Sequence, residues 1–155
     1  MNVDAGVDAG VMLPTRLTAT GSLSGMISAP KPQAGHDAIT NTSSFNLKSM
    51  NMGLGQLVFK VDINIGYDGL PMSATYSSTS AGFTCNAVIT SGTAADDTWV
   101  ALFNSPAGAN KGTCSLTLTR AMSTTSGYDV SGTVTITGAA EGGAAGGMVT
   151  VTGTF

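Results

Sequence analysis

The sequence predicts an all-β fold: a single antiparallel β-sandwich of immunoglobulin-like or jelly-roll-like type, with roughly eight to ten short strands and one internal disulfide. Three observations lead to this prediction. Apolar and hydroxyl-bearing residues alternate along most of the chain, and such alternation places them on opposite faces of strands. Turn sequences rich in Gly, Pro, Asp and Ser divide these stretches. Helical periodicity does not persist anywhere for more than about one turn.

Two parts of unequal length are predicted: an N-terminal segment, residues 1–13, and a sandwich domain, residues 14–155. The segment repeats the tetrapeptide Val-Asp-Ala-Gly from Val3 to Gly10, and this period preserves the alternation of a strand. It is interpreted either as a linker or as an edge strand with outward aspartates. As a strand, it would pair within its own sheet or be donated to a second copy. The apolar residues of this assembly strand are Val3, Val7, Val11 and Leu13.

The expected strands of the sandwich are separated by turn sequences such as Asp68-Gly69 and Ser91-Gly92. The first strand is interrupted at Gly21 and Gly25. The segment Gly138–Gly147, which is nearly all Gly and Ala, is expected to be a flexible loop between the last two strands. The strands are expected over Arg16–Ser28, Ser44–Ser49, Gln56–Ile65, Met72–Ser80, Phe83–Thr90, Thr98–Phe103, Thr113–Arg120, Tyr128–Thr137 and Met148–Phe155.

Both cysteines of the chain are expected on the apolar faces of their strands. Cys85 alternates in phase with Ile89, and Cys114 alternates in phase with Leu116. We predict a buried disulfide between them, because the chain offers no other cysteine as a partner. The alternative is a pair of free, buried thiols. Trp99 lies in a stretch that is apolar on both faces, so it is predicted to be a core residue.

The composition favours an extracytoplasmic protein without a nucleic-acid partner. Charged residues make up only 10% of the chain, against about 25% in typical soluble proteins. Its six basic residues are dispersed and the net charge is −3, which argues against a nucleic-acid-binding face. No apolar run is long enough to span a membrane. Because no export signal is recognised after Met1, either the protein is expected to be cytosolic or Met1 replaces an export signal that was removed, and the composition favours the second interpretation.

Few side chains are suited to catalysis, so no enzymatic activity, catalytic residue or cofactor is predicted. The single histidine, His36, is expected in an exposed turn, and the single glutamate lies in the Gly/Ala-rich loop. Asp62, Asn64 and Asp68 place oxygen atoms ahead of a turn, as a calcium site does. A solvated strand face that runs into an Asp-Gly turn explains the same residues, and no metal site is predicted.

Two sets of residues could form a ligand-binding surface. Tyr67, Tyr76 and Tyr128 are the residues expected to stack on a sugar, if a glycan is bound. Rows of threonine are expected to pair across the final hairpin, and they are interpreted as ordinary exposed strand residues rather than as a sugar-binding or ice-binding face. These rows are Thr133, Thr135 and Thr137 in one strand and Thr150, Thr152 and Thr154 in the next.

The repeat from Val3 to Gly10, followed by a Thr/Ser/Gly-rich β domain, resembles mature bacterial surface lipoproteins. In these proteins an acidic, Ala/Gly-rich spacer follows the lipidated cysteine. The stretches Tyr128–Val134 and Val149–Phe155 are similar to the final hairpins of such domains and to the closing strand of secreted pilin-like β-sandwich subunits. The lipid-bearing cysteine is absent here, so the resemblance implies a membrane anchor only if that cysteine was trimmed away.

The function expected first is a non-enzymatic, extracytoplasmic structural or assembly subunit of a surface filament, coat or shell. It would associate with copies of itself or with another surface protein. One alternative is a monomeric, surface-anchored adhesion module that binds a glycan or a protein. Another is a structural or decoration protein of a virion. Whether residues 3–13 pair within their own chain or with a second copy discriminates between the first two.

Overall fold

The structure, a computed structural model, describes residues 15–49, 58–92, 97–142 and 146–155. These residues form eleven antiparallel strands and no helix, which confirms the predicted all-β class. Hence none of them belongs to a helix long enough to cross a membrane. The strands are β1 (Thr15–Gly21), β2 (Gly25–Ala29), β3 (Gln33–Asp37), β4 (Thr42–Lys48), β5 (Phe59–Asp68), β6 (Ala74–Ser77), β7 (Thr84–Ser91), β8 (Thr98–Phe103), β9 (Thr113–Thr124), β10 (Gly127–Gly142) and β11 (Met148–Thr154).

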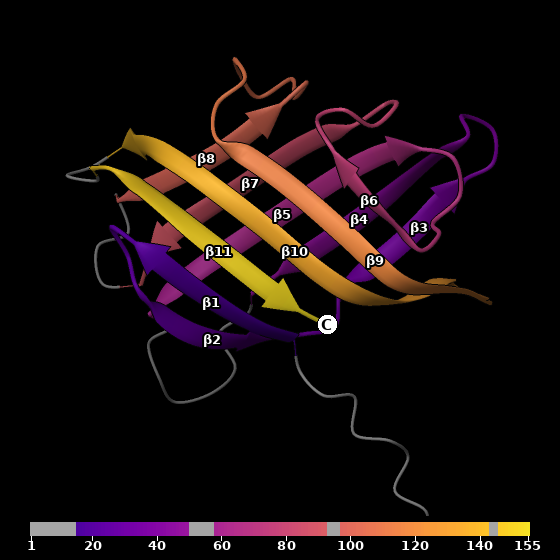
Figure 1. Ribbon diagram of the computed structural model, residues 1–155, viewed down its shortest axis with the longest axis horizontal. Helices are drawn as coiled ribbons and strands as arrows, with labels where there is room; N and C mark the ends of the chain where they lie inside the picture. Colours follow the sequence, from indigo (N-terminus) through magenta and orange to yellow (C-terminus); the bar gives the residue numbers. More distant parts are fainter. Residues whose placement is uncertain (1–14, 50–57, 93–96, 143–145) are drawn as a thin grey trace, which may run out of the picture.

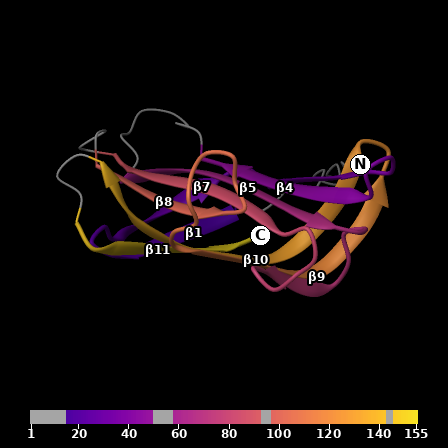
Figure 2. The ribbon, with the colours of Figure 1, turned by 90° about the horizontal axis from the view of Figure 1, so that it is seen from above.

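One continuous sheet folds over into two layers (Figures 1 and 2). The front layer of Figure 1 contains β6, β9, β10, β11, β1 and β2, and the back layer contains β3, β4, β5, β7 and β8. Strand β10 is 16 residues long and belongs to both layers. Near its start Tyr128 pairs with Ala34 of β3, and near its end Ala139 pairs with Val100 of β8. This strand therefore closes the sandwich at two of its corners.

The core lies between the layers and consists of the inward residues of both. Phe45 of β4 is fully buried, and its ring lies 5.1 Å from the ring of Phe155, centroid to centroid. A disulfide joins Cys85 of β7 to Cys114 of β9, so it links the two layers. The Cα atoms of this pair lie 6.4 Å apart. Trp99 is 3% exposed. The predicted disulfide and the predicted core position of Trp99 are both confirmed.

Three segments differ from the sequence prediction. Strand β3 was expected to be part of a turn, because its five residues show no apolar alternation; pairing with β4 along its whole length makes it a strand. Strand β10 continues to Gly142, so the expected loop Gly138–Gly147 is wrong in its first half. A β-carbon at Gly138 would lie 3.0 Å from Cβ of Trp99, so small residues let β10 approach β8 closely. Strand β9 extends to Thr124 and forms a hairpin with β10.

The predicted N-terminal assembly strand, with Val3, Val7, Val11 and Leu13, lies outside the described residues. So does the start of the strand that was expected over Gln56–Ile65. Its described part, β5, runs three residues further than expected, to Asp68. The interruption expected between Gly21 and Gly25 is confirmed, because β1 ends at the first glycine and β2 begins at the second.

Candidate functional site

The outer face of the back layer carries a transverse row of side-chain amides. Gln33 of β3 pairs with Asn46 of β4, Asn46 pairs with Asn64 of β5, and Asn64 pairs with Asn86 of β7. Paired residues of neighbouring strands point to the same face. The four amides therefore form one line, which we call the amide row. With strands about 4.8 Å apart, the row is about 14 Å long.

A floor without bulky side chains lies beside the amide row. Two residues further along the same four strands, a second transverse line is formed by Gly35, Ser44, Gly66 and Thr84, which also lie opposite one another in neighbouring strands. The two glycines leave the backbone uncovered. A β-carbon at Gly66 would lie 2.6 Å from Oγ1 of Thr84, so this position accommodates no larger residue without a shift. The amide row forms one wall above this floor, and we call the resulting depression the trough.

The trough is made of two adjoining cavities that share Ser44 and Asn46. The larger has a volume of about 500 Å³ and ends at the β9–β10 hairpin, where Thr124, Ser126 and half-buried Tyr128 line it. The smaller has a volume of about 290 Å³ and ends at Ser105 and Pro106. The residues that line both cavities carry no charged side chain. The trough is therefore neutral along its length.

The amides of the row are available to a ligand. The Asn64 Nδ2 atom donates a hydrogen bond to Asp62 Oδ1 at 3.0 Å. Within the described part of the chain, the side chains of Gln33, Asn46 and Asn86 make no hydrogen bond. Each amide offers two N–H donors and one oxygen acceptor. The arrangement can hydrogen-bond an elongated polar molecule at several points.

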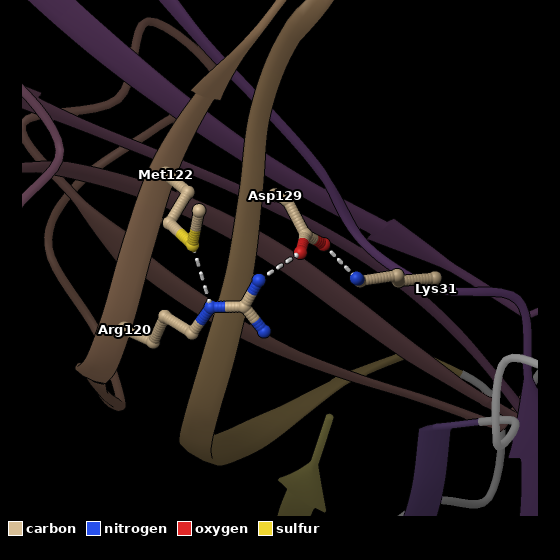
Figure 3. Close-up of polar contacts among 4 residues, drawn as sticks. All are labelled: Lys31, Arg120, Met122 and Asp129. Carbon is tan, nitrogen blue, oxygen red and sulfur yellow. Dashed lines mark hydrogen bonds and ion pairs between the residues drawn. The ribbon is translucent and has the colours of Figure 1, made fainter.

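An ion-pair network fixes the hairpin end of the trough (Figure 3). Asp129 of β10 accepts hydrogen bonds from Lys31, which precedes β3, and from Arg120 of β9. The Arg120 Nη2 atom lies 2.9 Å from Asp129 Oδ2, and Arg120 Nε donates to Met122 Sδ at 3.0 Å. The network therefore ties the start of β3 to the β9–β10 hairpin, on which Tyr128 lies.

The threonine rows pair as predicted, on the outer face of the front layer. Thr133, Thr135 and Thr137 of β10 lie opposite Thr154, Thr152 and Thr150 of β11, respectively. The array continues onto β1, where Thr18 and Thr20 lie opposite Thr152 and Thr150. The hydroxyls of Thr137 and Thr150 are 3.0 Å apart and bond to each other. Mutual hydrogen bonding agrees with their interpretation as cross-strand partners.

Two of the three expected sugar-stacking tyrosines are core residues instead. Tyr67 is 1% exposed and Tyr76 is 8% exposed, and their rings stack with centroids 3.8 Å apart. Tyr67 has the same parity as the inward residues Ile63 and Ile65 of β5, which explains its burial. Burial raises the pKa of the Tyr67 hydroxyl above its ordinary value. Of the three, only Tyr128 lines the trough.

The three residues that resemble calcium ligands do not lie close enough together to bind one ion. Asp62, Asn64 and Asp68 all lie on the extended strand β5, where the two aspartates are six positions and therefore about 20 Å apart. One cation cannot contact both. Asp62 instead pairs with Lys48, with Nζ and Oδ2 2.9 Å apart. Among the described residues, no three His, Cys, Asp or Glu side chains gather where they could hold a metal ion.

His36 was expected in an exposed turn, but it lies half-buried on β3, with Nδ1 3.0 Å from Ser43 Oγ. The Ser43 hydroxyl donates its single proton to the carbonyl oxygen of Gly69 at 2.6 Å. The imidazole must therefore be the donor in the His36–Ser43 contact. As a donor it cannot take the proton of Ser43, which is only 2% exposed. The pair has the geometry of a structural contact rather than of an activated nucleophile.

The amide row was missed in the sequence because its members come from four strands whose register is not local. One signal was present. Asn is depleted in strands, yet Asn46, Asn64 and Asn86 each occupy an outward position in the middle of a strand.

Comparison with protein family models, with curated proteins and with solved structures finds no match to the chain. The proposed function therefore depends on the trough itself.

Proposed function

We propose that the domain is a non-enzymatic, extracytoplasmic module that binds an extended glycan chain in the trough. The observation that carries the proposal is the amide row beside the floor at Gly35 and Gly66. Sugar hydroxyls both donate and accept hydrogen bonds, and so do side-chain amides. A neutral wall of such groups matches a polyhydroxylated chain better than it matches an apolar or strongly ionic partner.

The dimensions of the trough favour a chain over a single sugar. The amide row is about 14 Å long, and the two cavities adjoin at Ser44 and Asn46. A ligand that contacts all four amides must therefore extend across β3, β4, β5 and β7. Tyr128 lies at the hairpin end of the larger cavity, where it pairs with Ala34 and packs against the core.

The extracytoplasmic location is supported by the disulfide, since such bonds persist mainly in oxidising compartments. The low fraction of charged residues agrees with a surface protein. A module of this kind would act as an adhesion domain, with the trough facing the glycan.

The test is a glycan array followed by calorimetric titration of the best-bound oligosaccharide. Asn46→Ala and Asn64→Ala are each expected to weaken binding about fivefold to tenfold, because each removes one net hydrogen-bond contribution of about 1 kcal/mol. The matched control is Thr152→Ala on the opposite face, which should bind within about twofold of the unmodified protein. An array without a bound glycan, or trough variants that bind as tightly as the control, would contradict the proposal.

A second candidate function is the structural or assembly subunit, and the edge of β2 favours it. Among the described residues, β2 pairs only with β1, so its other edge has no strand partner there. Residues 25–29 contain neither a charge nor a proline, and Met26 is 62% exposed. Natural edge strands commonly carry a charged residue or a proline, which prevents pairing with other chains. This edge would accept a strand from a second copy, such as residues 3–13.

Sedimentation velocity tests this second function. If β2 is an assembly edge, the full chain forms oligomers that dissociate when residues 1–12 are deleted or when Met26→Lys places a charge at the edge. Met148→Lys is the matched control, because Met148 is 51% exposed but lies on β11, which has a strand partner on each side. It should leave the oligomers intact. A full chain that sediments as a monomer at every concentration would exclude the assembly function.

A further inference from the structure

A third cavity extends the trough beyond the amide row. It has a volume of about 200 Å³ and is lined by Pro30, Lys31, Gln33, Asn46 and Lys48. Gln33 and Asn46 also line the larger cavity of the trough, so the two cavities adjoin. Two of the five lining residues are lysines, and none is a carboxylate. This end of the binding surface thus differs in charge from the neutral trough.

The carboxylates that pair with the two lysines lie outside this lining. Asp129 holds Lys31, but it also pairs with Arg120, so two cations share one anion and the network keeps a net positive charge (Figure 3). Lys48 pairs with Asp62, and the side chains of this pair are 71% and 42% exposed. Exposed pairs contribute little to stability, so Lys48 can exchange its partner for an anionic ligand group at small cost.

We propose that this cavity is an anion-binding subsite, and that the glycan held in the trough carries acidic groups. The inference rests on the proposed function, because it assigns a chemical class to the ligand of the same trough. Lys31 and Lys48 would bind the anionic oxygens, and the amides of Gln33 and Asn46 would orient them. Since the rest of the trough is neutral, only the part of the chain beside Lys31 and Lys48 needs to carry an acidic group.

A carboxylate of a uronic acid and a sulfate ester share this chemistry, so the test compares three polymers. A uronate-containing polysaccharide, a sulfated galactan and a neutral glucan are titrated into the full chain at low and high salt. At low salt at least one acidic polymer is expected to bind about tenfold more tightly than the neutral one. This preference should decrease at high salt, because salt screens exposed charges. The acidic polymer that binds more tightly identifies the anionic group.

The variants Lys48→Gln and Lys31→Gln should each lower the affinity for the acidic polymer about fivefold to tenfold. Neither should change the affinity for the neutral polymer. Lys60→Gln is the matched control, because Lys60 is on the outer face of β5 but does not line any of the three cavities. Thermal unfolding of each variant checks that the fold is retained.

The possible failures are distinguishable. If the neutral polymer binds as tightly as the acidic ones, or if both lysine variants match Lys60→Gln, the anion-binding subsite is wrong and glycan binding stands. If acidic and neutral polymers all fail to bind, both the subsite and the proposed function are wrong.

Discussion

Removal of the disulfide by the double substitution Cys85→Ala and Cys114→Ala is expected to lower the free energy of unfolding by about 3–4 kcal/mol. The two cysteines are 29 residues apart in sequence, and the bond between them restricts the unfolded chain to conformations in which that loop is closed. It also joins β7 to β9, and therefore one layer of the sandwich to the other. Equilibrium unfolding in guanidinium chloride measures the difference.

A second measurement separates the cross-link from the cavity that the alanines create. Reduction of the unmodified protein opens the bond without removing side-chain volume, so it should account for most of the loss. If the reduced and oxidised proteins unfold at the same denaturant concentration, the cross-link contributes nothing. Reduction should also affect the trough, because Cys85 lines its smaller cavity beside Asn86. Reduction is therefore expected to weaken glycan binding, while the Lys31–Asp129–Arg120 network at the other end remains in place.

Alternation along the chain was sufficient to predict the fold class, because it records which face of each strand is buried. Cys85 and Leu116 were placed in the core by parity, and Trp99 by its position in a stretch that is apolar on both faces; all three are buried. The pairing of the last two threonine rows was also predictable, since β10 and β11 are consecutive in the chain and form a hairpin. Alternation and hairpin pairing are local features of the sequence, and alternation occurs wherever a strand has one buried and one solvent-exposed face.

The candidate site was not predictable in this way. Strand β3 has no apolar alternation, and its place in the sheet depends on its pairing with β4 and with Tyr128, far along the chain. The amide row exists only because the registers of β3, β4, β5 and β7 bring Gln33 and three asparagines into one line. A shift of one residue in any of these strands would move its amide to the buried face. The same dependence on register explains why Tyr76 was expected at the surface, although β6 packs it against Tyr67.

The variant Tyr67→Phe is expected to be as stable as the unmodified protein or more stable by about 1 kcal/mol, because the hydroxyl it removes is a buried group without a partner. The Tyr67 Oη atom is buried and has no hydrogen-bond partner among the described residues. The ring itself is essential, since it stacks on Tyr76 in the core. Tyr67→Ala is therefore expected to cost about 3–5 kcal/mol, as removal of other buried aromatic rings does. Equilibrium unfolding of the two variants measures both effects.

The variant Tyr76→Phe is the matched control, and its effect should have the opposite sign. The Tyr76 hydroxyl accepts a hydrogen bond from the backbone N–H of Met72 at 3.2 Å and donates one to the carbonyl oxygen of the same residue at 3.3 Å. Its removal leaves those backbone groups without this partner and should cost about 1 kcal/mol. If Tyr67→Phe destabilises the protein as much as Tyr76→Phe does, the Tyr67 hydroxyl makes a stabilising hydrogen bond in the folded protein, contrary to this prediction.

Alkaline pH provides an independent measurement of the same buried hydroxyl. In the unfolded chain Tyr67 ionises with a pKa near 10.0, whereas in the folded protein burial raises its pKa. Above pH 10 the unfolded state therefore binds fewer protons than the folded state, and the free energy of unfolding falls as pH rises. Below pH 10 the hydroxyl is protonated in both states and contributes no pH dependence. Tyr67→Phe removes this dependence, so the stability of the variant relative to the unmodified protein should increase steadily above pH 10. A constant difference between pH 8 and pH 11 would show that Tyr67 ionises equally well in both states.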